Sequence, residues 1–177
     1  AIGCVPRGTA VLRSGARARD ALYVTGRLGG AWRPGCRHHL LFEPRIDAGR
    51  FLARNDFATA MIDLSDGIAT DLPRLLDASK RGALLDADAI PLSRAAQRTD
   101  HPLRHALCDG EDFELLFTIS PSNLDRFKTA WKQQFPRLPA TRIGTIVGSP
   151  KQRILQYPDG SIAPLQSSGY QHFQGME

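Results

Sequence analysis

Residues 60–68, with the sequence AMIDLSDGI, constrain the fold of this chain more than any other segment. An apolar run that is typical of a buried strand ends abruptly there in two aspartates, a serine and a glycine. A second acidic cluster, DGEDFE at residues 109–114, stands directly against another apolar run. The formal net charge is +5, so acidic clusters are harder to explain as solvated surface than in an acidic protein. We therefore expect negative charge to be concentrated at two strand ends.

The length of 177 residues suits one ordinary domain with a sizeable core, so we expect residues 1–177 to form a single unit. The composition, 42% hydrophobic and 23% charged, is typical of a soluble protein, and no apolar run reaches the ~20 residues of a membrane helix. No secretory peptide is visible. The three cysteines form no CxxC pair, which favours reduced thiols and a cytoplasmic location. Residues 1–5 read as a strand in progress, so we expect the natural start to lie upstream.

Basic residues are spread along the chain with no run of five or six, although the pI is about 9.5. They are not interleaved with aromatic residues, as they are in proteins that bind single strands. We expect no nucleic-acid partner and no membrane partner. Phosphate groups on a small ligand would use the surplus of arginine equally well, and charge that serves only solubility is an equally good explanation.

Periodicity and turn residues predict an alternation of strands and helices along most of the chain. Strands are expected at residues 20–26, 57–62, 82–86, 113–119, 141–147 and 153–157, with a short return strand through residue 165. Helices are expected at residues 46–54, 68–77, 121–135 and, in two pieces, 91–107. Pro73 should kink its helix unless Asp71 caps a later start. Strands alternate with helices early and pair as neighbours late, which predicts an α+β fold with a mixed β-sheet covered by helices.

The first acidic cluster has the oxygen ligands that Mg²⁺ prefers, and this ion usually takes one or two carboxylates when a nucleotide supplies the rest. Asp63 and Asp66 are three residues apart across a strand-to-helix turn, so both side chains can reach the same rim. Gly67 lets backbone approach a ligand, and the free N–H groups of the new helix favour anions. The alternative is that Ser65 or Asp66 caps the helix, the commoner use of such residues at this place, and both roles can coexist.

At the second acidic cluster the four carboxylates cannot all serve one site. Successive side chains of a strand point to opposite faces, so Glu111 and Phe113 should share one face, and Asp112 and Glu114 the other. Gly110 permits the turn that would present Glu111 or Asp112 to a ligand. At least one of the four carboxylates is expected to be structural or solvated.

Arg45 and Arg13 are candidate phosphate ligands, because a guanidinium binds two oxygens at once. Single arginines are more often members of surface ion pairs, and that alternative stays open. His38 and His39 remain unassigned, since neighbours on a strand point apart and no third metal ligand lies at a usual spacing. Walker A, GxSxG and nucleotide-binding GxGxxG sequences are missing. Any chemistry must therefore use carboxylates and a metal.

Six motifs resemble the carboxy-terminal domain of thiamine-monophosphate kinase, within the superfamily of aminoimidazole ribonucleotide synthetase. They occur in family order as RSGA at 13–16, LYVTGRLG at 22–29, FEPR at 42–45, MIDLSDGI at 61–68, GEDFELLF at 110–117 and GYQHF at 169–173. The DLSDG element is the specific one, because related members carry different sequences at that strand end. The resemblance implies a fold like that of the carboxy-terminal domain of aminoimidazole ribonucleotide synthetase.

The resemblance also implies ATP- and Mg²⁺-dependent phosphorylation of thiamine monophosphate to thiamine diphosphate by direct transfer between phosphates. In such transfer the protein mainly positions the groups and neutralises charge, so no nucleophilic side chain is expected. Carried over by position, Asp66, with Asp63 and Ser65 beside it, would serve the metal and the phosphates.

At the other end of the substrate, the resemblance implies that Glu111 and Asp112 line the thiamine. Tyr170 and Phe173, in the closing GYQHF motif, would help to cover the heterocycle.

The chain departs from the family pattern at three positions. The family usually has glycine in place of Asp109, aspartate in place of Gly30 and an acidic residue in place of Gln171. The family's amino-terminal domain, with its own nucleotide site and its homodimer contact, is not in this chain. We therefore expect the isolated chain to lack most of the ATP site and to be inactive. Two alternatives remain: a related synthetase of the superfamily, and a non-catalytic ligand-binding or scaffold domain.

Overall fold

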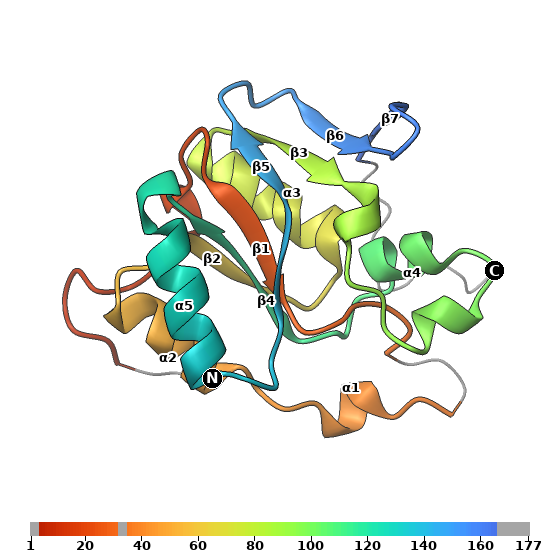
Figure 1. Cartoon of the computed structure of the whole chain (residues 1–177), viewed down its shortest axis with the longest axis horizontal. Helices are drawn as coiled ribbons and strands as arrows, with labels where there is room; N and C mark the ends of the chain where they lie inside the picture. Colours follow the sequence, from red (N-terminus) through yellow and green to blue (C-terminus); the bar gives the residue numbers. More distant parts are fainter. Residues whose placement is uncertain (1–3, 32–34, 166–177) are drawn as a thin grey trace, which may run out of the picture.

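The computed structural model describes residues 4–31 and 35–165, which fold around one seven-stranded sheet (Figure 1). The strands are β1 (Ala21–Thr25), β2 (Ala58–Leu64), β3 (Gly82–Asp86), β4 (Glu114–Ile119), β5 (Ala140–Val147), β6 (Arg153–Gln156) and β7 (Ile162–Pro164). Their order in the sheet is β2-β4-β1-β5-β3-β6-β7. All neighbours are antiparallel except β3 and β6, which are parallel. The predicted mixed sheet of an α+β fold is confirmed.

Five α-helices accompany the sheet: α1 (His38–Leu41), α2 (Ile46–Arg54), α3 (Ile68–Ser79), α4 (Pro102–Cys108) and α5 (Leu124–Gln134). Four single-turn 3₁₀ helices complete the described chain: η1 (Arg13–Gly15), η2 (Ala87–Ala89), η3 (Ala96–Arg98) and η4 (Pro121–Asn123). The prediction of helix at residues 91–107 is right only for α4 and the turn η3. Before η3, Ser93 donates its hydroxyl to the carbonyl of Gly29, and the chain forms this contact with another segment in place of a first helical piece.

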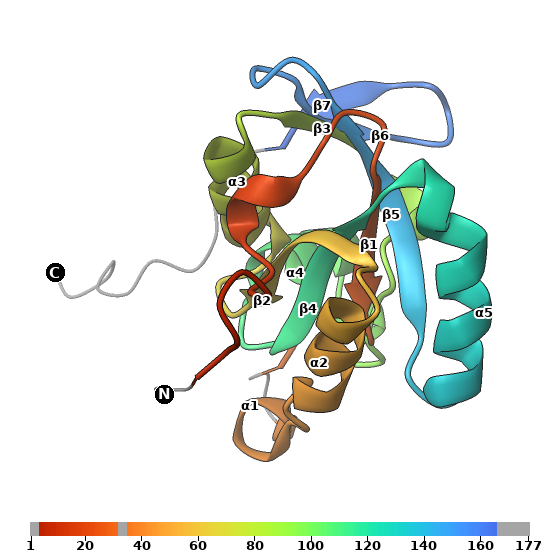
Figure 2. The ribbon, with the colours of Figure 1, turned by 90° about the vertical axis from the view of Figure 1, so that its left-hand side faces the viewer.

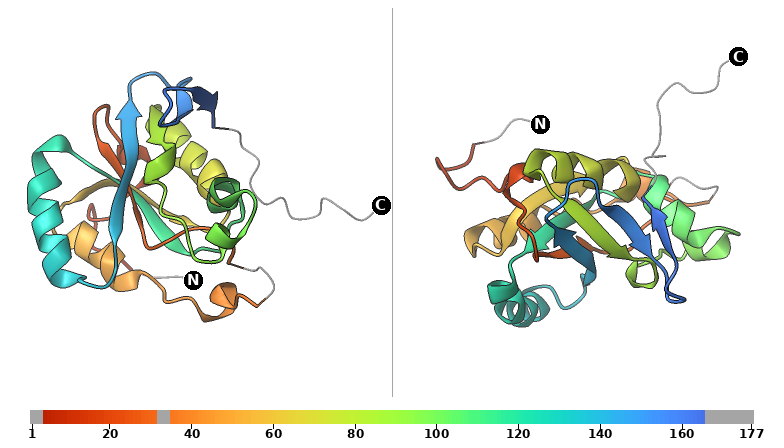
Figure 3. Two further views of the ribbon diagram at one scale, coloured as in Figure 1. Left: turned by 45° about the vertical axis from the view of Figure 1, so that its right-hand side comes forward. Right: turned by 90° about the horizontal axis from the view of Figure 1, so that it is seen from above.

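The sheet carries a separate apolar core on each face, and Figures 2 and 3 show α3 and α5 on opposite sides of it. Along β1 the side chains alternate, so Leu22 and Val24 face one core and Tyr23 the other. The first core is completed by apolar residues of α3 and α4. The second is aromatic and includes Phe117, stacked on Tyr23 at 5.7 Å between ring centroids, together with side chains of α2 and α5.

Helix α3 begins at Ile68 and continues through Pro73, so the expected later start at Asp71 is wrong, and the expected kink stays a prediction. Leu72, Leu75 and Leu76 are completely buried on the sheet, and this packing outweighs the one backbone hydrogen bond that proline removes. The helix begins after Gly67, and no side chain caps its first turn. The alternative that Ser65 or Asp66 caps this helix is therefore also wrong.

The strand directions place three chain segments at one end of the sheet. Strand β2 ends at Leu64, which is paired with Glu114, the first residue of β4. Strand β1 is antiparallel to β4 and ends at the same place, where Val24 is paired with Leu116. Both acidic clusters and the loop after β1 therefore meet at this end.

Candidate functional site

The two acidic loops that follow β2 and precede β4 are joined backbone to backbone. Phe113 donates its N–H to the carbonyl of Leu64 at 2.8 Å, and Glu111 donates its N–H to the carbonyl of Ser65 at 2.7 Å. Two clusters more than forty residues apart in the sequence are thus joined by two backbone hydrogen bonds. Negative charge is held in place there by main-chain hydrogen bonds as well as by side chains.

The contact between these loops depends on glycine. Gly110 has φ 71°, and a Cβ placed on it would lie 2.7 Å from the carbonyl oxygen of Ser65. Gly67 has φ 90°, and its Cβ would lie 2.8 Å from the carbonyl oxygen of Leu107. The close approach at Gly67 is therefore made to the end of α4 and the start of the α4–β4 loop. That loop has a strained backbone of its own, because Glu111 and Phe113 have positive φ, at about 1–2 kcal/mol each.

A buried aspartate that the sequence analysis did not assign to the site holds the DLSDG loop. Asp71, in the first turn of α3, is 1% exposed, and its Oδ2 accepts the N–H of Ser65 at 3.1 Å and that of Asp66 at 2.8 Å. Burial raises the pKa of Asp71, while the N–H of Asp66 and the guanidinium of Arg74 act in the opposite direction. The only sequence signal was the Asp71–Arg74 spacing, which places the two side chains on one helix face.

Arg74 joins the two aspartates of this network. Its Nη1 lies 2.5 Å from Oδ2 of Asp66 and 2.7 Å from Oδ1 of Asp71. The hydrogen bond to Asp66 is the largest cause of the raised pKa of Arg74. In this structure the carboxylate of Asp66 is therefore bound by a cationic side chain.

A cavity of about 410 Å³ opens beside β2 and brings together several of the predicted residues. Its polar lining comes from Arg13, Asp63, Ser65, Asp71 and Arg74. Asp63 is exposed on β2, an edge strand of the sheet. Asp66 is not part of the lining, but it contacts Arg74, which is. Guanidinium groups, carboxylates and a hydroxyl in one cavity suit a phosphate ester that carries a cation.

The oxygen donors at this cavity fit a divalent cation that is held mostly by other ligands. In residues 4–31 and 35–165, no group of three or more His, Cys, Asp or Glu side chains is arranged to hold a metal ion. Mg²⁺ commonly takes one or two carboxylates and completes its shell with phosphate and water oxygens. Asp63 and Ser65 offer such oxygens at the cavity, and the metal-binding role of Asp63 and Asp66 stays a prediction.

Asp112 is a buried acid, and only one of its two carboxyl oxygens is hydrogen-bonded to the described residues. It is 3% exposed, its Oδ1 accepts the N–H of Gly29 at 2.8 Å, and its Oδ2 has no hydrogen-bond partner among the described residues. The pKa of Asp112 is raised to about 8, mainly by burial; nearby Glu114 and Asp109 also act to raise it, and the N–H of Gly29 acts to lower it. This side chain lines a cavity of about 660 Å³ whose other polar residues include Arg27, Ser93, Arg94 and Arg98.

Arg45 is engaged in an ion pair within the chain. Its Nε and Nη2 each lie 2.8 Å from the buried carboxylate of Glu114, which also accepts the hydroxyl of Thr25, and its Nη1 lies 3.1 Å from Glu43. These contacts correspond to the ion-pair alternative of the sequence analysis. A phosphate would have to compete with Glu114 for this guanidinium, and the phosphate-binding role of Arg45 stays a prediction.

Two of the departures from the family pattern touch each other. Asp109 accepts the N–H of Gly30 at 2.9 Å through Oδ2, and its carboxylate also lies 2.8 Å from Nδ1 of His105. The carboxylate of Asp109 thereby holds the glycine turn after β1 against the end of α4. Gln171 lies outside the described residues.

His38 and His39 lie on the short helix α1 rather than on a strand. His38 Nε2 lies 2.8 Å from the carbonyl oxygen of Asp112, and His39 Nδ1 lies 3.0 Å from that of Ala31. Both rings therefore have backbone partners.

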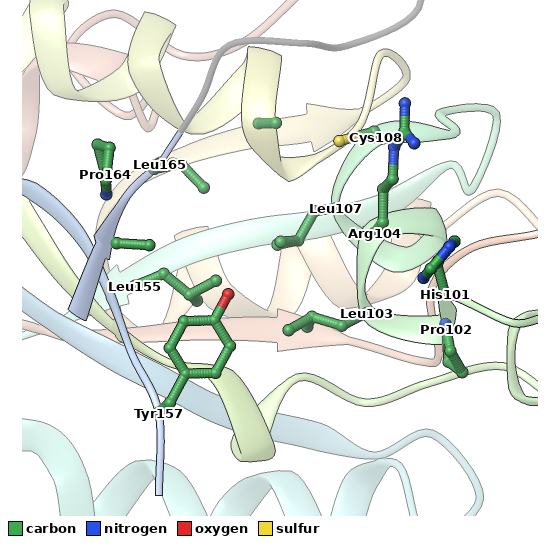
Figure 4. Close-up of a pocket in the computed structure, with 12 residues that line it drawn as sticks. His101, Pro102, Leu103, Arg104, Leu107, Cys108, Leu155, Tyr157, Pro164 and Leu165 are labelled. Atoms are coloured by element: carbon green, nitrogen blue, oxygen red, sulfur yellow. The ribbon is translucent and has the colours of Figure 1, made fainter. Parts of the chain in front are cut away.

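A third cavity, of about 560 Å³, lies between α4 and the strands β6 and β7. Figure 4 shows Leu155 and Tyr157 on one side of it and Leu103 and Leu107 of α4 on the other. Its lining is mainly apolar, and Leu165, the last described residue, is part of it. Tyr170 and Phe173, predicted to cover a heterocycle, lie outside the described residues.

No helix in the described part of the chain is long and apolar enough to cross a membrane. The predicted cytoplasmic location remains a prediction.

Comparison with known protein families identifies the family of this chain. Residues 34–155 match the model of the AIR synthase related protein, C-terminal domain. The chain belongs to this family. The fold and the family predicted from the six motifs are thereby confirmed.

Similar members of the family are named thiamine-monophosphate kinase. The protein of that name from Rhodopirellula baltica is 41% identical over 143 residues, which are 77% of this chain and 43% of that protein. The crystal structure of thiamine-monophosphate kinase from Stenotrophomonas maltophilia K279a superimposes with a TM-score of 0.74 at 32% identity, over 90% of this chain and 56% of that one.

A third similar structure is described as AaThiL complexed with AMPPCP and TMP. Its TM-score is 0.67 at 26% identity, and the match covers 92% of this chain and 54% of that one. The chain thus spans about half the length of the relatives that it matches.

Proposed function

We propose that this chain is the substrate-side domain of a thiamine-monophosphate kinase, which transfers the terminal phosphoryl group of ATP to thiamine monophosphate and forms thiamine diphosphate. The observation that carries the proposal is the union of the DLSDG loop with the GEDFE loop through the N–H groups of Glu111 and Phe113. The names of the similar relatives and the ligands of one similar structure support it.

In the proposed reaction the chain positions phosphates and offsets their charge. Asp63 and Asp66 would hold Mg²⁺, which would supply positive charge to offset that of the phosphates. Ser65 offers a hydroxyl and Arg13 a guanidinium to the phosphates from the same cavity. Asp71 keeps the backbone of the loop in place by accepting two of its N–H groups.

The thiamine end is proposed to lie against the GEDFE loop, with Glu111 and Asp112 beside it and Tyr170 and Phe173 over the heterocycle. Thiamine carries a cationic ring, which acidic side chains attract. Asp112 is neutral at pH 7 without a ligand, because its pKa is about 8. A cationic ring beside Oδ2 of Asp112, which has no hydrogen-bond partner among the described residues, would favour the ionised form of this carboxyl group.

The remaining parts of the proposal concern the whole protein. We propose that an amino-terminal domain supplies most of the ATP site and the homodimer contact, that the enzyme acts in the cytoplasm, and that the isolated chain has no kinase activity. A mixture of isolated chain, ATP, Mg²⁺ and thiamine monophosphate should then yield no thiamine diphosphate.

Turnover by the full-length protein tests the function. With ATP, Mg²⁺ and thiamine monophosphate, chromatography should show thiamine diphosphate and ADP in equal amounts. Asp66→Asn should lower the rate at least tenfold, whereas the control Asp77→Asn, which changes an exposed aspartate on the following helix α3, should keep it. A folded full-length protein that forms no thiamine diphosphate would contradict the kinase function.

A non-catalytic ligand-binding domain is the second candidate. Two observations favour it. Arg74 binds the carboxylate of Asp66, and Asp109 stands just before the GEDFE loop, where the family pattern has glycine. Under this alternative, the full-length protein binds thiamine monophosphate in calorimetry but gives no product in the turnover assay.

A further inference from the structure

We propose that Arg74 is a positioning residue which holds the carboxylate of Asp66 while no divalent cation is bound and competes with that cation for the same oxygen. The proposal rests on the function proposed above, because it concerns the metal role of Asp66. It extends that function with two residues, Arg74 and Asp71, that the family motifs do not contain.

The geometry gives Arg74 two unequal partners. One nitrogen, Nη1, contacts Asp66 at 2.5 Å and Asp71 at 2.7 Å. Asp71 is buried, and its second oxygen is fully used by the N–H groups of Ser65 and Asp66. The side chain of Asp66 is 27% exposed. Asp71 is thus the fixed anchor of the network, and Asp66 is the side chain that can change partner.

Charge determines what happens when a cation arrives. Without Arg74, which contacts both carboxylates, Asp66 and Asp71 would repel each other with no positive charge between them. Arg74 removes this repulsion when the site is empty. A divalent cation on Asp66 would offset the same repulsion. Arg74 and the cation therefore have the same electrostatic role, and they compete for the carboxylate of Asp66.

The guanidinium of Arg74 can move away from Asp66. Its side chain is 46% exposed, and it lines the 410 Å³ cavity together with Arg13 and Ser65. Release from Asp66 would turn the guanidinium toward the space proposed for the phosphates. Asp71 keeps its hold on the loop backbone meanwhile, so the loop shape is retained while its cation changes.

Mn²⁺ binding to the full-length protein, measured by calorimetry without ATP or thiamine monophosphate, tests the proposal. Arg74→Gln should lower the Kd for Mn²⁺ about two- to fivefold, the effect of removing an exposed ion pair. Arg74→Lys keeps the charge and should give a smaller change. Asp66→Asn should abolish this binding, and Asp71→Asn should raise the Kd because the loop loses its anchor.

Arg153→Gln is the matched control, since Arg153 pairs with Asp77 on the same helix α3 but away from the loop. It should leave the Kd unchanged. If Arg74 only stabilised the loop, Arg74→Gln would instead raise the Kd, and that result would overturn the proposal. An unchanged Kd for Arg74→Gln, or no Mn²⁺ binding by the wild type, would overturn it as well.

Failure of the kinase function can be told apart from failure of this proposal. The Mn²⁺ measurement contains no nucleotide or thiamine, and thermal unfolding of each variant checks its folding. Tighter Mn²⁺ binding by Arg74→Gln in a protein that makes no thiamine diphosphate would reject the function and keep the competition between Arg74 and the cation.

Discussion

The surroundings of single residues at this site change their protonation or their pairing, and Asp112 is the clearest case. Its pKa is about 8 in the folded chain, against an ordinary value of 3.8. Below pH 4 both folded and unfolded states bind the proton. Between pH 4 and 8 the unfolded state loses it while the folded state keeps it, so the free energy of unfolding falls as the pH rises through this window.

Asp112→Asn should remove this pH dependence. Because asparagine keeps an oxygen for the N–H of Gly29 and carries no charge, the variant should gain stability relative to the wild type as the pH rises from 4.5 to 7.5. We expect a gain on the order of 1 kcal/mol or more, since each pKa unit corresponds to about 1.4 kcal/mol. Urea unfolding at both pH values measures it. An equal stability difference at the two pH values would contradict the assignment.

Arg45 is the second residue whose surroundings define its role. Glu114 is 3% exposed in its side chain and receives two hydrogen bonds from Arg45. Arg45→Met would leave that carboxylate buried with the hydroxyl of Thr25, and we expect a loss of about 3 kcal/mol in the free energy of unfolding. The double variant Arg45→Met, Glu114→Gln should recover part of this loss. A loss below about 1 kcal/mol would show that the pair is a surface contact.

At the scale of elements, the site depends on how closely the β2–α3 loop and the α4–β4 loop approach. Gly110→Ala would add left-handed strain and drive a Cβ to 2.7 Å from the carbonyl of Ser65. Gly160→Ala is a matched control, because Gly160 also has positive φ but has nothing within 4 Å of an added Cβ.

We expect Gly160→Ala to cost about 1 kcal/mol and Gly110→Ala to cost at least about 2 kcal/mol, because only the second adds a backbone clash. Chemical unfolding gives both values. Equal costs would mean that the two loops separate easily, and that the acidic clusters are not held together by this contact.

At the scale of the whole molecule, apolar runs bounded by turn residues were enough to predict β1 to β7, since each face of the sheet buries its own core. The strand expected at residues 1–5 is wrong for residues 4 and 5, the part that the structure describes. The meeting of the acidic clusters followed from the antiparallel pairing of β2 with β4, which the sequence did not show. The Arg45–Glu114 pair was missed for the same reason: its partners are 69 residues apart. Pro73 was misjudged because tertiary packing of α3 outweighs a local preference.

The central claim is that the DLSDG loop and the GEDFE loop form one substrate site. Calorimetry of the full-length protein with thiamine monophosphate, Mg²⁺ and a non-hydrolysable ATP analogue tests it most directly. We predict that Asp66→Asn and Glu111→Gln each weaken thiamine monophosphate binding at least tenfold, although the two residues lie on different loops. Wild-type affinity in both variants, with folding intact, would contradict the claim.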